Sequence, residues 1–365
     1  MKRSEAGTRL VKGWEEGFSP GSMLVLGALT GGYRGLLGTR DWLYARGVLR
    51  SRAVDCPVVS IGNLTVGGTG KTPAVELVVR TLIELGHRPA VVSRGYGRQS
   101  SGTQVVADTA SIRIDADEAG DEPFLLARRL PGVPVVVGAN RHEAATLARQ
   151  RFAATAVVLD DGFQHRTLRK DLEIVMTRAR RPWGNGRLLP AGPLREPLTA
   201  LERADLVVAV GDRTEIDVAA VEDTIERYAP GTPVLTAAYT PVECVEAERM
   251  LPRPLHALSG TRVVAFAGIA TPEAFKRTLQ ELDVDVAEMK KFPDHYWYTV
   301  DDLRRLEHLA DALGADALVT TEKDGVRLRR LPLPRRPLLV VTVRLELLRG
   351  DAEWRKAFER VCAKR

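Results

Sequence analysis

Short runs of apolar, mostly β-branched residues alternate with longer segments of helical pattern from residue 57 onward. Such runs predict strands that are buried on both faces, as in a parallel sheet covered by helices. The first series of predicted strands covers residues 58–61, 90–93, 133–137, 156–159, 172–176 and 206–210. A second series covers residues 263–267, 318–321 and 338–343. This alternation predicts an α/β fold.

The two series of strands are separated by a segment punctuated by proline, residues 241–254. Proline interrupts regular structure, so we predict a domain boundary in this segment. The chain length of 365 residues agrees, because single hydrophobic cores rarely grow beyond about 250–300 residues. We expect two α/β/α sandwich domains facing each other across a cleft, at residues 51–245 and 246–365, after an N-terminal tail and amphipathic helix at residues 1–50.

The N-terminal segment, residues 23–49, combines leucine, valine and aromatic side chains with several arginines. The uncharged run before and within it, residues 17–33, holds five glycines and is too short and too polar to span a bilayer. Two interpretations stay open. The segment is either a helix in a membrane interface, with its arginines on anionic lipid, or an amphipathic helix packed on its own domain.

The composition is that of a globular protein, with 44% hydrophobic and 27% charged residues. It excludes disordered, collagen-like and polytopic membrane classes. A net charge of +6 favours anionic partners such as phosphates, lipid headgroups or nucleic acid without choosing among them. The three cysteines are far apart and form no CxxC pair, which indicates neither a disulfide framework nor a zinc site and is typical of a reducing compartment.

A glycine-rich segment, here called the phosphate loop, follows the first predicted strand. It consists of Thr65, Val66, Gly67, Gly68, Thr69, Gly70, Lys71 and Thr72, and Pro73 then opens a helical stretch. Backbone N–H groups of such a turn close around a polyphosphate, Lys71 reaches the outer phosphates, and the Thr72 hydroxyl ligates magnesium. Thr65 stands where the usual pattern has its first glycine. The strand before and the helix after predict a nucleoside triphosphate site in a first domain of P-loop NTPase type.

Two carboxylates, Asp160 and Asp161, follow the predicted strand at residues 156–159. Ligands of open α/β sheets bind at this carboxyl edge of the strands. A polar strand-ending turn is the alternative, but beside a phosphate loop we favour metal ligation, by either carboxylate.

Three classes of P-loop protein differ in the motifs that accompany the loop. A GTPase needs an Asn-Lys-x-Asp motif that binds guanine, and the most similar segment, residues 321–324, has the wrong spacing. A partitioning-type ATPase has a signature lysine where this chain has Val66. A small-molecule kinase needs a base near the acceptor hydroxyl and basic groups that hold an anionic substrate, and the chain has candidates for both.

At this point the chain resembles a known family, the tetraacyldisaccharide 4'-kinases of lipid A biosynthesis. The blocks that carry the resemblance are Ile61-Gly62-Asn63-Leu64 with the phosphate loop and Pro73, Ser93-Arg94-Gly95-Tyr96-Gly97, Gly120-Asp121-Glu122-Pro123, Asn140-Arg141, Asp160-Asp161-Gly162-Phe163-Gln164-His165, Pro190-Ala191-Gly192-Pro193-Leu194-Arg195-Glu196, Phe266-Ala267-Gly268-Ile269, Phe292-Pro293-Asp294-His295 and Thr321-Glu322-Lys323-Asp324. They fall in order between about residues 57 and 325. The chain departs from the family pattern at Ala270 and Tyr296.

The resemblance implies transfer of the γ-phosphate of ATP, with Mg²⁺, to the 4'-hydroxyl of tetraacyldisaccharide 1-phosphate, which forms lipid IVA. The alternative is a P-loop membrane-recruitment ATPase that transfers no phosphate. The resemblance also favours the interfacial interpretation of residues 23–49. It implies a peripheral, monotopic protein on the cytoplasmic face of the Gram-negative inner membrane, with an acylated glucosamine disaccharide 1-phosphate and anionic lipids as partners and with neither a nucleic acid nor a protein partner.

Several residue roles rest on the resemblance. It suggests Asp121 as the catalytic base and Glu122 as a carboxylate on the magnesium side, although locally the two acids are also typical of a helix start. It pairs His295, from the second domain, with the base in a dyad, although a lone histidine beside aromatic residues is more often structural. The candidates for holding a phosphate of the substrate or nucleotide are Arg94, Arg98, Arg141 and His165, because guanidinium groups bind phosphate bidentately.

Overall fold

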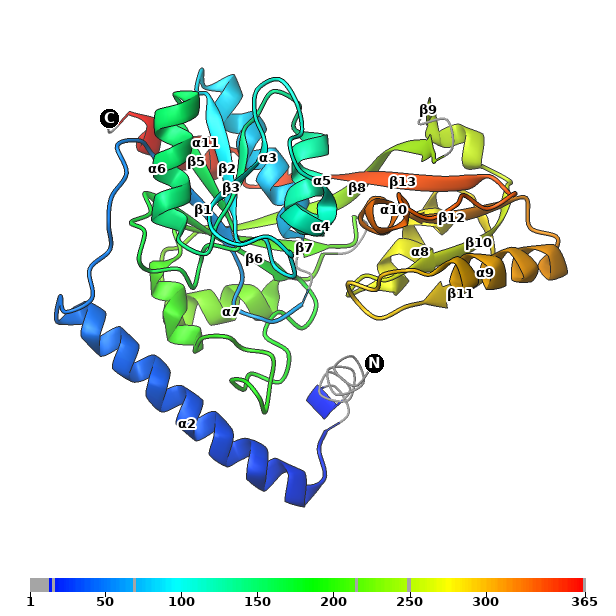
Figure 1. Cartoon of the computed structure of the whole chain (residues 1–365). Helices are drawn as coiled ribbons and strands as arrows, with labels where there is room; N and C mark the ends of the chain where they lie inside the picture. The colour runs from blue at the N-terminus through cyan, green and yellow to red at the C-terminus, as the bar shows by residue number, and fades with distance from the viewer. Residues whose placement is uncertain (1–12, 15–16, 68–69, 214–215, 248–250, 364–365) are drawn as a thin grey trace. The chain divides into compact units, whose positions relative to one another are not determined.

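The computed structural model describes residues 13–14, 17–67, 70–213, 216–247 and 251–363 (Figure 1). Its chain divides into two compact units, the first formed by Met1–Tyr239 and Leu345–Arg365 and the second by Thr240–Arg344. The chain leaves the first unit within β8 (Val234–Glu246) and returns to it within β13 (Leu338–Arg349). The second unit is therefore an insertion into the first. Gly68 and Thr69 of the phosphate loop, and residues 1–12 of the predicted tail, lie outside the described residues.

The first unit is built on a mostly parallel sheet, as the apolar runs predict. Its strands lie in the order β3-β4-β2-β5-β1-β6-β7-β8. Their bounds are β1 (Val58–Gly62), β2 (Pro89–Ser93), β3 (Gln104–Ala107), β4 (Val135–Val137), β5 (Ala156–Asp160), β6 (Leu172–Arg178) and β7 (Leu206–Gly211). The edge strand β3 runs antiparallel to β4, and the neighbouring pairs from β4 to β8 are parallel. β1, which leads into the phosphate loop, is central and fully buried.

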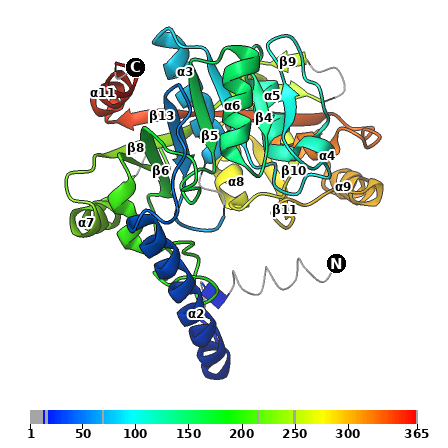
Figure 2. The same cartoon turned by 60° about the vertical axis from the view of Figure 1, so that its left-hand side comes forward.

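Helices cover this sheet and supply much of its core. They are α3 (Lys71–Glu84), α4 (Ala116–Ala119), α5 (Asp121–Arg129), α6 (Arg141–Phe152), α7 (Ala219–Tyr228) and α11 (Asp351–Cys362), with the 3-10 helix η1 (Leu198–Arg203). Figure 2 shows α6 lying over the strands, and its small residues Ala144, Ala145 and Ala148 pack there against valines of β2, β4 and β5. The small side chains allow helix and sheet to approach closely.

The N-terminal helix α2 (Pro20–Ala45) confirms that residues 23–49 are largely helical. One side of it packs on the first unit, where Leu37 and Tyr33 join the hydrophobic core and the Tyr33 hydroxyl donates a 2.7 Å hydrogen bond to the Arg195 carbonyl. Other apolar side chains of α2 remain exposed, among them Leu24 at 79% and Leu36 at 72%. Within the described residues, no helix has the length and apolarity needed to cross a membrane.

The last segment, Leu345–Arg365, belongs to the first unit, whereas the sequence places it in the second domain. Helix α11 provides the reason. Trp354 and Phe358 are buried, and the Trp354 indole donates a 3.0 Å hydrogen bond to the Thr81 hydroxyl of α3. Arg360 adds an ion pair of 2.9 Å with Asp205. Periodicity predicts an amphipathic helix here but does not say which core its apolar face joins.

The part of the sheet that lies in the second unit is parallel, in the order β11-β10-β12-β13. Its strands are β10 (Arg262–Ala267), β11 (Asp285–Lys291), β12 (Ala317–Thr321) and the first part of β13, and a short strand β9 (Leu251–Arg253) pairs with β8. Its helices are η2 (Leu255–Leu258), α8 (Pro272–Glu281), α9 (Val300–Leu313) and α10 (Glu322–Leu328). Alternate residues of β10 enter two different hydrophobic clusters, Val263, Ala265 and Ala267 in one and Val264 and Phe266 in the other. The strand is therefore covered on both faces, as expected for an α/β sandwich.

Candidate active site

The phosphate loop joins β1 to α3, as the sequence predicts. Two of its glycines have left-handed backbone, Gly67 with φ 110° and Gly70 with φ 81°, a conformation that other residues adopt only at a cost. Gly70 is the N-cap of α3, and a Cβ atom there would lie 2.1 Å from the Tyr239 hydroxyl oxygen. Pro73 lies in the first turn of α3, where a backbone N–H has no helical partner.

Asn63 holds the phosphate loop from within. Its side chain is fully buried. The amide nitrogen donates a hydrogen bond of 2.5 Å to the Thr65 carbonyl, and the amide oxygen accepts a hydrogen bond of 3.1 Å from Lys71 Nζ. Its own carbonyl accepts a 2.9 Å hydrogen bond from Gln164. The Lys71 ammonium is thereby positioned at the start of α3, where the helix dipole also favours an anion.

Asp161 forms ion pairs with two cations of the site. Its carboxylate lies 3.2 Å from Lys71 Nζ and 2.9 Å from Arg195 Nη1. Burial raises the pKa of Asp161, but the charges of Lys71 and Arg195 outweigh burial and hold that pKa below its ordinary value. Asp161 is therefore ionised, and the positive charges of Lys71 and Arg195 compensate its negative charge.

Asp160 has the opposite environment, although it is the adjacent residue. It ends β5 beside Ile61 of β1, is 2% exposed, and accepts a 2.9 Å hydrogen bond from the Ser93 hydroxyl. Burial, together with the negative charges of Glu122 and Asp161, raises the pKa of Asp160 to about 7. The charge of Lys71 lowers this pKa, but it does not outweigh burial and the two neighbouring carboxylates.

Asp121 and Glu122 form the first turn of α5, after Gly120 with φ 92°. Asp121 is 7% exposed, and its carboxylate accepts a 2.9 Å hydrogen bond from the Glu122 backbone N–H. This geometry fits the helix-start interpretation of the two acids. The effect of Glu122 on the pKa of Asp160 places its carboxylate near the end of β5 as well.

The residues predicted to ligate a metal, Thr72, Glu122, Asp160 and Asp161, do not form a ready-made cage. Among the residues that the structure describes, no three His, Cys, Asp or Glu side chains are grouped to hold a metal ion. Magnesium does not need such a group, because it usually binds one or two carboxylates and completes its shell with water and phosphate oxygens. Burial and, after it, the charges of Glu122 and Asp161 raise the pKa of Asp160, and a divalent cation beside these carboxylates would offset both effects, so the donor set is compatible with Mg²⁺.

A basic cluster lies near these carboxylates. Arg141, the first residue of α6, is 5% exposed and donates to the Ala139 carbonyl at 3.1 Å, while its Nε atom is buried without a hydrogen-bond partner in the described part of the chain. Burial and the charge of Arg94 lower the pKa of Arg141 to about 10. Burial and the charges of Arg141, Lys170 and Arg94 lower the pKa of His165 to about 4, so its ring is neutral at pH 7.

This geometry can be compared with known proteins. The family model described as tetraacyldisaccharide-1-P 4'-kinase (LpxK) matches residues 22–363. The chain belongs to this family. It is 45% identical over 336 residues to the tetraacyldisaccharide 4'-kinase of Anaeromyxobacter sp. (strain K), and this alignment covers 89% of each chain. It is 43% identical over 307 residues to that of Syntrophus aciditrophicus (strain SB), covering 81% of this chain and 82% of the relative.

A solved structure of the tetraacyldisaccharide 4'-kinase family also matches. The crystal structure of LpxK from Aquifex aeolicus in complex with ATP superposes with a TM-score of 0.73 at 30% sequence identity. The match covers 93% of this chain and 99% of that chain. The family resemblance and the α/β fold predicted from the sequence are thereby confirmed.

His295, the histidine that the family resemblance singles out, lies in the second unit. It ends the segment Phe292-Pro293-Asp294-His295 after β11, and its backbone is left-handed, with φ 61°. Aromatic rings of Phe292, Tyr296 and Tyr298 pack against one another beside it, with ring centroids 4.9 to 5.3 Å apart. The aromatic neighbours thus support the turn, and the imidazole itself contacts charged groups.

The structure brings together more residues than the sequence singles out. Asn63 and Arg195 appear in the sequence only as members of family blocks, without a role of their own. Arg195 follows Asp161 by 34 positions in a segment without a strand or long helix, so no local pattern signals their ion pair. The polar asparagine directly after an apolar strand is the one signal that points to Asn63.

Proposed function

We propose that the phosphate loop and the carboxylates beside it carry out the reaction for which the family is named. In that reaction the γ-phosphate of ATP passes to the 4'-hydroxyl of tetraacyldisaccharide 1-phosphate and lipid IVA forms. Membership of the family makes the chain an ATP-dependent kinase of lipid A biosynthesis. The observation that carries the assignment of the site is Lys71, whose ammonium is held by Asn63 and Asp161 at the start of α3.

We assign Lys71, together with the backbone amides of the phosphate loop, to binding the β- and γ-phosphates of ATP. Phosphoryl transfer depends mainly on positioning and on neutralising charge. Asp161 and Asn63 orient the ammonium before ATP arrives, so little reorganisation is needed when the phosphates bind. Arg195, which shares Asp161, keeps that carboxylate compensated when Lys71 turns to the nucleotide.

We assign Asp160, and not Asp161, to the magnesium ion. Asp161 is paired with Lys71 and Arg195, whereas burial, and after it the charges of Glu122 and Asp161, raise the pKa of Asp160 to about 7. Thr72 and Glu122 complete the proposed set of protein ligands. Bound Mg²⁺ would supply positive charge to the phosphate oxygens.

Asp121 is the proposed base for the acceptor hydroxyl, with His295 as the partner that orients it. The two belong to different units, so the proposal requires that their side chains meet in the complex with bound substrates. Asp121→Asn and His295→Asn should each lower kcat with little effect on the KM for ATP, and the double variant should be scarcely worse than the worse single variant. Fully multiplicative losses would show that the two residues act independently.

Arg94, Arg141 and His165 are proposed to hold a phosphate of the substrate. Arg141 has a buried Nε atom whose hydrogen-bonding capacity the described residues do not use. The low pKa of His165 leaves a neutral ring that can donate one hydrogen bond without adding charge.

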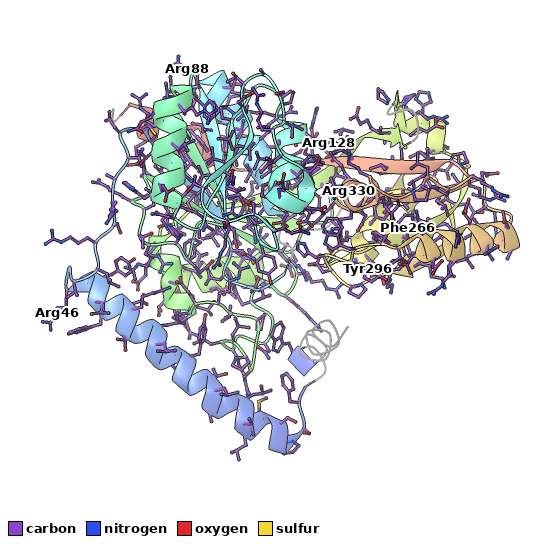
Figure 3. The ribbon with its side chains drawn as sticks, in the orientation of Figure 1. Arg46, Arg88, Arg128, Phe266, Tyr296 and Arg330 are labelled. Atoms are coloured by element: carbon purple, nitrogen blue, oxygen red, sulfur yellow. The ribbon has the colours of Figure 1, made fainter. Side chains whose placement is uncertain are left out.

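Peripheral attachment to the cytoplasmic face of the inner membrane is proposed through α2. Val25, Leu29 and Leu36 are spaced four and seven residues apart, which places them on one side of the helix, and all three are exposed. Arg46, labelled in Figure 3 at the end of α2, lies over the exposed ring of Trp42 at 5.3 Å. Aromatic and basic residues together are typical of helices that lie on anionic lipid.

The deciding assay follows the transfer of labelled γ-phosphate from ATP to tetraacyldisaccharide 1-phosphate in detergent micelles. We expect lipid phosphorylation that depends on acceptor and on Mg²⁺. ATP hydrolysis at the same rate with and without acceptor, with no phosphorylated lipid, would instead support a membrane-recruitment ATPase.

A further inference from the structure

One side of α2 lies on residues 188–196, here called the support segment (Figure 1). The Tyr33 hydroxyl donates a 2.7 Å hydrogen bond to the Arg195 carbonyl. Two turns further along the helix, Arg40 forms an ion pair with Glu196. The spacing places Tyr33 and Arg40 on the same side of α2. The helix therefore contacts the end of the support segment at two successive residues.

Glu196 is a buried carboxylate between two arginines. Its side chain is fully buried, and Arg203 of η1 forms its second ion pair. Arg203 also lies over the ring of Phe163, with its guanidinium carbon 4.4 Å from the ring centroid. A buried charge that loses one of its partners is costly, so both arginines are needed to hold Glu196 in place. The end of the support segment is thus fixed in part by a residue of α2.

The support segment in turn runs beside the start of the phosphate loop. The Arg195 backbone N–H donates a 2.7 Å hydrogen bond to the Leu64 carbonyl, and the Val66 backbone N–H donates one of 2.8 Å to the Pro193 carbonyl. These two hydrogen bonds flank an antiparallel β-bridge. The backbone of the first loop residues is therefore held by the backbone of the support segment.

The Arg195 side chain extends this connection to the carboxylates of the site. Its Nη1 atom donates to both oxygens of Asp161, at 2.9 Å each, and to the Gln164 side-chain oxygen at 3.3 Å. Gln164 donates to the Asn63 carbonyl, and Asp161 is the ion-pair partner of Lys71. A displacement of Arg195 would consequently move the groups that orient the Lys71 ammonium, as well as the start of the loop.

We propose that Tyr33 and Arg40 of α2 are positioning residues for ATP binding, which act through Arg195 and Glu196. This side of the helix sets the position of the phosphate loop, while the exposed apolar side of the helix stays available to lipid. The inference rests on the proposed function for the assignment of the phosphate loop to ATP. It makes α2 a support of the nucleotide site in addition to a membrane anchor.

Calorimetric titration of the full chain with Mg²⁺ and an ATP analogue that is not hydrolysed tests this role. Tyr33→Phe removes one hydroxyl and keeps the ring, so it should weaken binding about threefold to tenfold, the usual effect of one hydrogen bond. Arg40→Met should weaken binding further, because Glu196 then keeps only one of its two cations. Arg40→Lys restores a positive charge beside Glu196 and should recover most of the affinity.

Tyr44→Phe and Arg34→Met are the matched controls, because they make the same changes at other positions of α2. The Tyr44 ring lies against Arg166, with its centroid 4.4 Å from the guanidinium carbon, and Arg34 is exposed. Both control variants should bind the analogue as tightly as the wild type. The proposal is wrong if Tyr33→Phe and Arg40→Met also bind like the wild type, or if the controls weaken binding as much as they do.

Hydrogen exchange measured by mass spectrometry separates positioning from a general loss of stability. In Tyr33→Phe without nucleotide, the amides of residues 64–66 and 193–195 should exchange faster than in the wild type, because the hydrogen bonds between these stretches depend on the position of Arg195. Peptides from β2 and α6 should be accelerated less. Equal acceleration in all peptides of the first unit would show that the hydroxyl only stabilises the fold, and it would contradict the proposal.

Kinetics provide an independent measurement. In the lipid kinase assay, Tyr33→Phe should raise the KM for ATP by the same factor as the dissociation constant of the analogue, with little change in the KM for the acceptor. A rise in the KM for the acceptor alone would contradict the inference. A wild type that does not bind the ATP analogue would refute the proposed function. A wild type that binds it no more tightly than Tyr33→Phe and Arg40→Met would refute this inference alone.

Discussion

Replacement of Asp160 by asparagine should stabilise the protein while abolishing its activity. Asp160 is 2% exposed, and its pKa is raised from 3.8 to about 7, first by burial and then by the charges of Glu122 and Asp161. That difference corresponds to about 4 kcal/mol at most. An asparagine side chain at this position would keep the shape and still accept the hydrogen bond from Ser93. The variant therefore removes a buried charge without creating a cavity.

The pH dependence of this stabilisation follows from the sign of the pKa change. The folded state binds the proton of Asp160 more tightly than the unfolded state does. Asp160 therefore does not lower the free energy of unfolding below pH 3.8. The loss of stability grows as the pH rises to about 7 and is complete above that pH. The gain from Asp160→Asn in the free energy of unfolding should consequently be about 3 kcal/mol larger at pH 8 than at pH 5. The kinase activity should be lost at both pH values, because the proposed magnesium ligand is gone.

Urea unfolding without nucleotide or Mg²⁺, followed by tryptophan fluorescence, measures this difference. The signal reports mainly on the first unit, where Trp183 and Trp354 are buried. Asp161→Asn is the control: its carboxylate is paired with Lys71 and Arg195, so it should destabilise by about 1 kcal/mol at both pH values. The reasoning is refuted if Asp160→Asn destabilises the protein at pH 8, or if its effect is the same at pH 5 and pH 8.

Three further sets of variants test the loop and the helix. Lys71→Ala should lower kcat by two to three decades, the usual cost of roughly 3 to 4 kcal/mol for one preorganised charge, and near wild-type turnover of the folded variant would remove Lys71 from the mechanism. Gly70→Ala should weaken ATP binding measured by calorimetry, because its Cβ would meet the Tyr239 hydroxyl and φ is 81°; Tyr239→Phe, which removes that oxygen, should restore part of the loss. The double variant Leu29→Ser and Leu36→Ser should lose sedimentation with anionic liposomes while keeping ATP affinity, since both side chains are exposed, and undiminished sedimentation would argue against docking through α2.

Much of the first unit could be predicted from the sequence, because its strands are apolar runs and its phosphate loop is a local motif. The edge strands β3 and β11 do not follow from the sequence. Gln104 of β3 is exposed, and four of the seven residues of β11 are charged, so neither gives the continuous apolar run of a central strand. These strands form because a neighbouring strand offers them hydrogen bonds.

For the candidate site as well, one part could be predicted from the sequence and another could not. Lys71, Asp160 and Asp161 follow predicted strands or glycines, so their place at the sheet edge could be inferred. The opposite pKa shifts of the two aspartates could not, because they depend on burial, on Lys71 and on Arg195, and Arg195 lies 34 residues beyond Asp161. Ion pairs between such distant positions arise only from the folded chain.

The hydrogen bond between Trp354 and Thr81 spans 273 positions and ties α11 to α3, the helix that follows the phosphate loop. During synthesis the N-terminal part of a chain emerges first and domains tend to fold as they appear. Here the last helix of the nucleotide-binding unit is made only after the whole inserted unit. We therefore expect the first unit to remain incomplete until both the inserted unit and α11 have been synthesised, with the surface of α3 that Trp354 covers exposed until then. The helix that follows the phosphate loop is thus supported by residues that the ribosome adds only after a whole second unit.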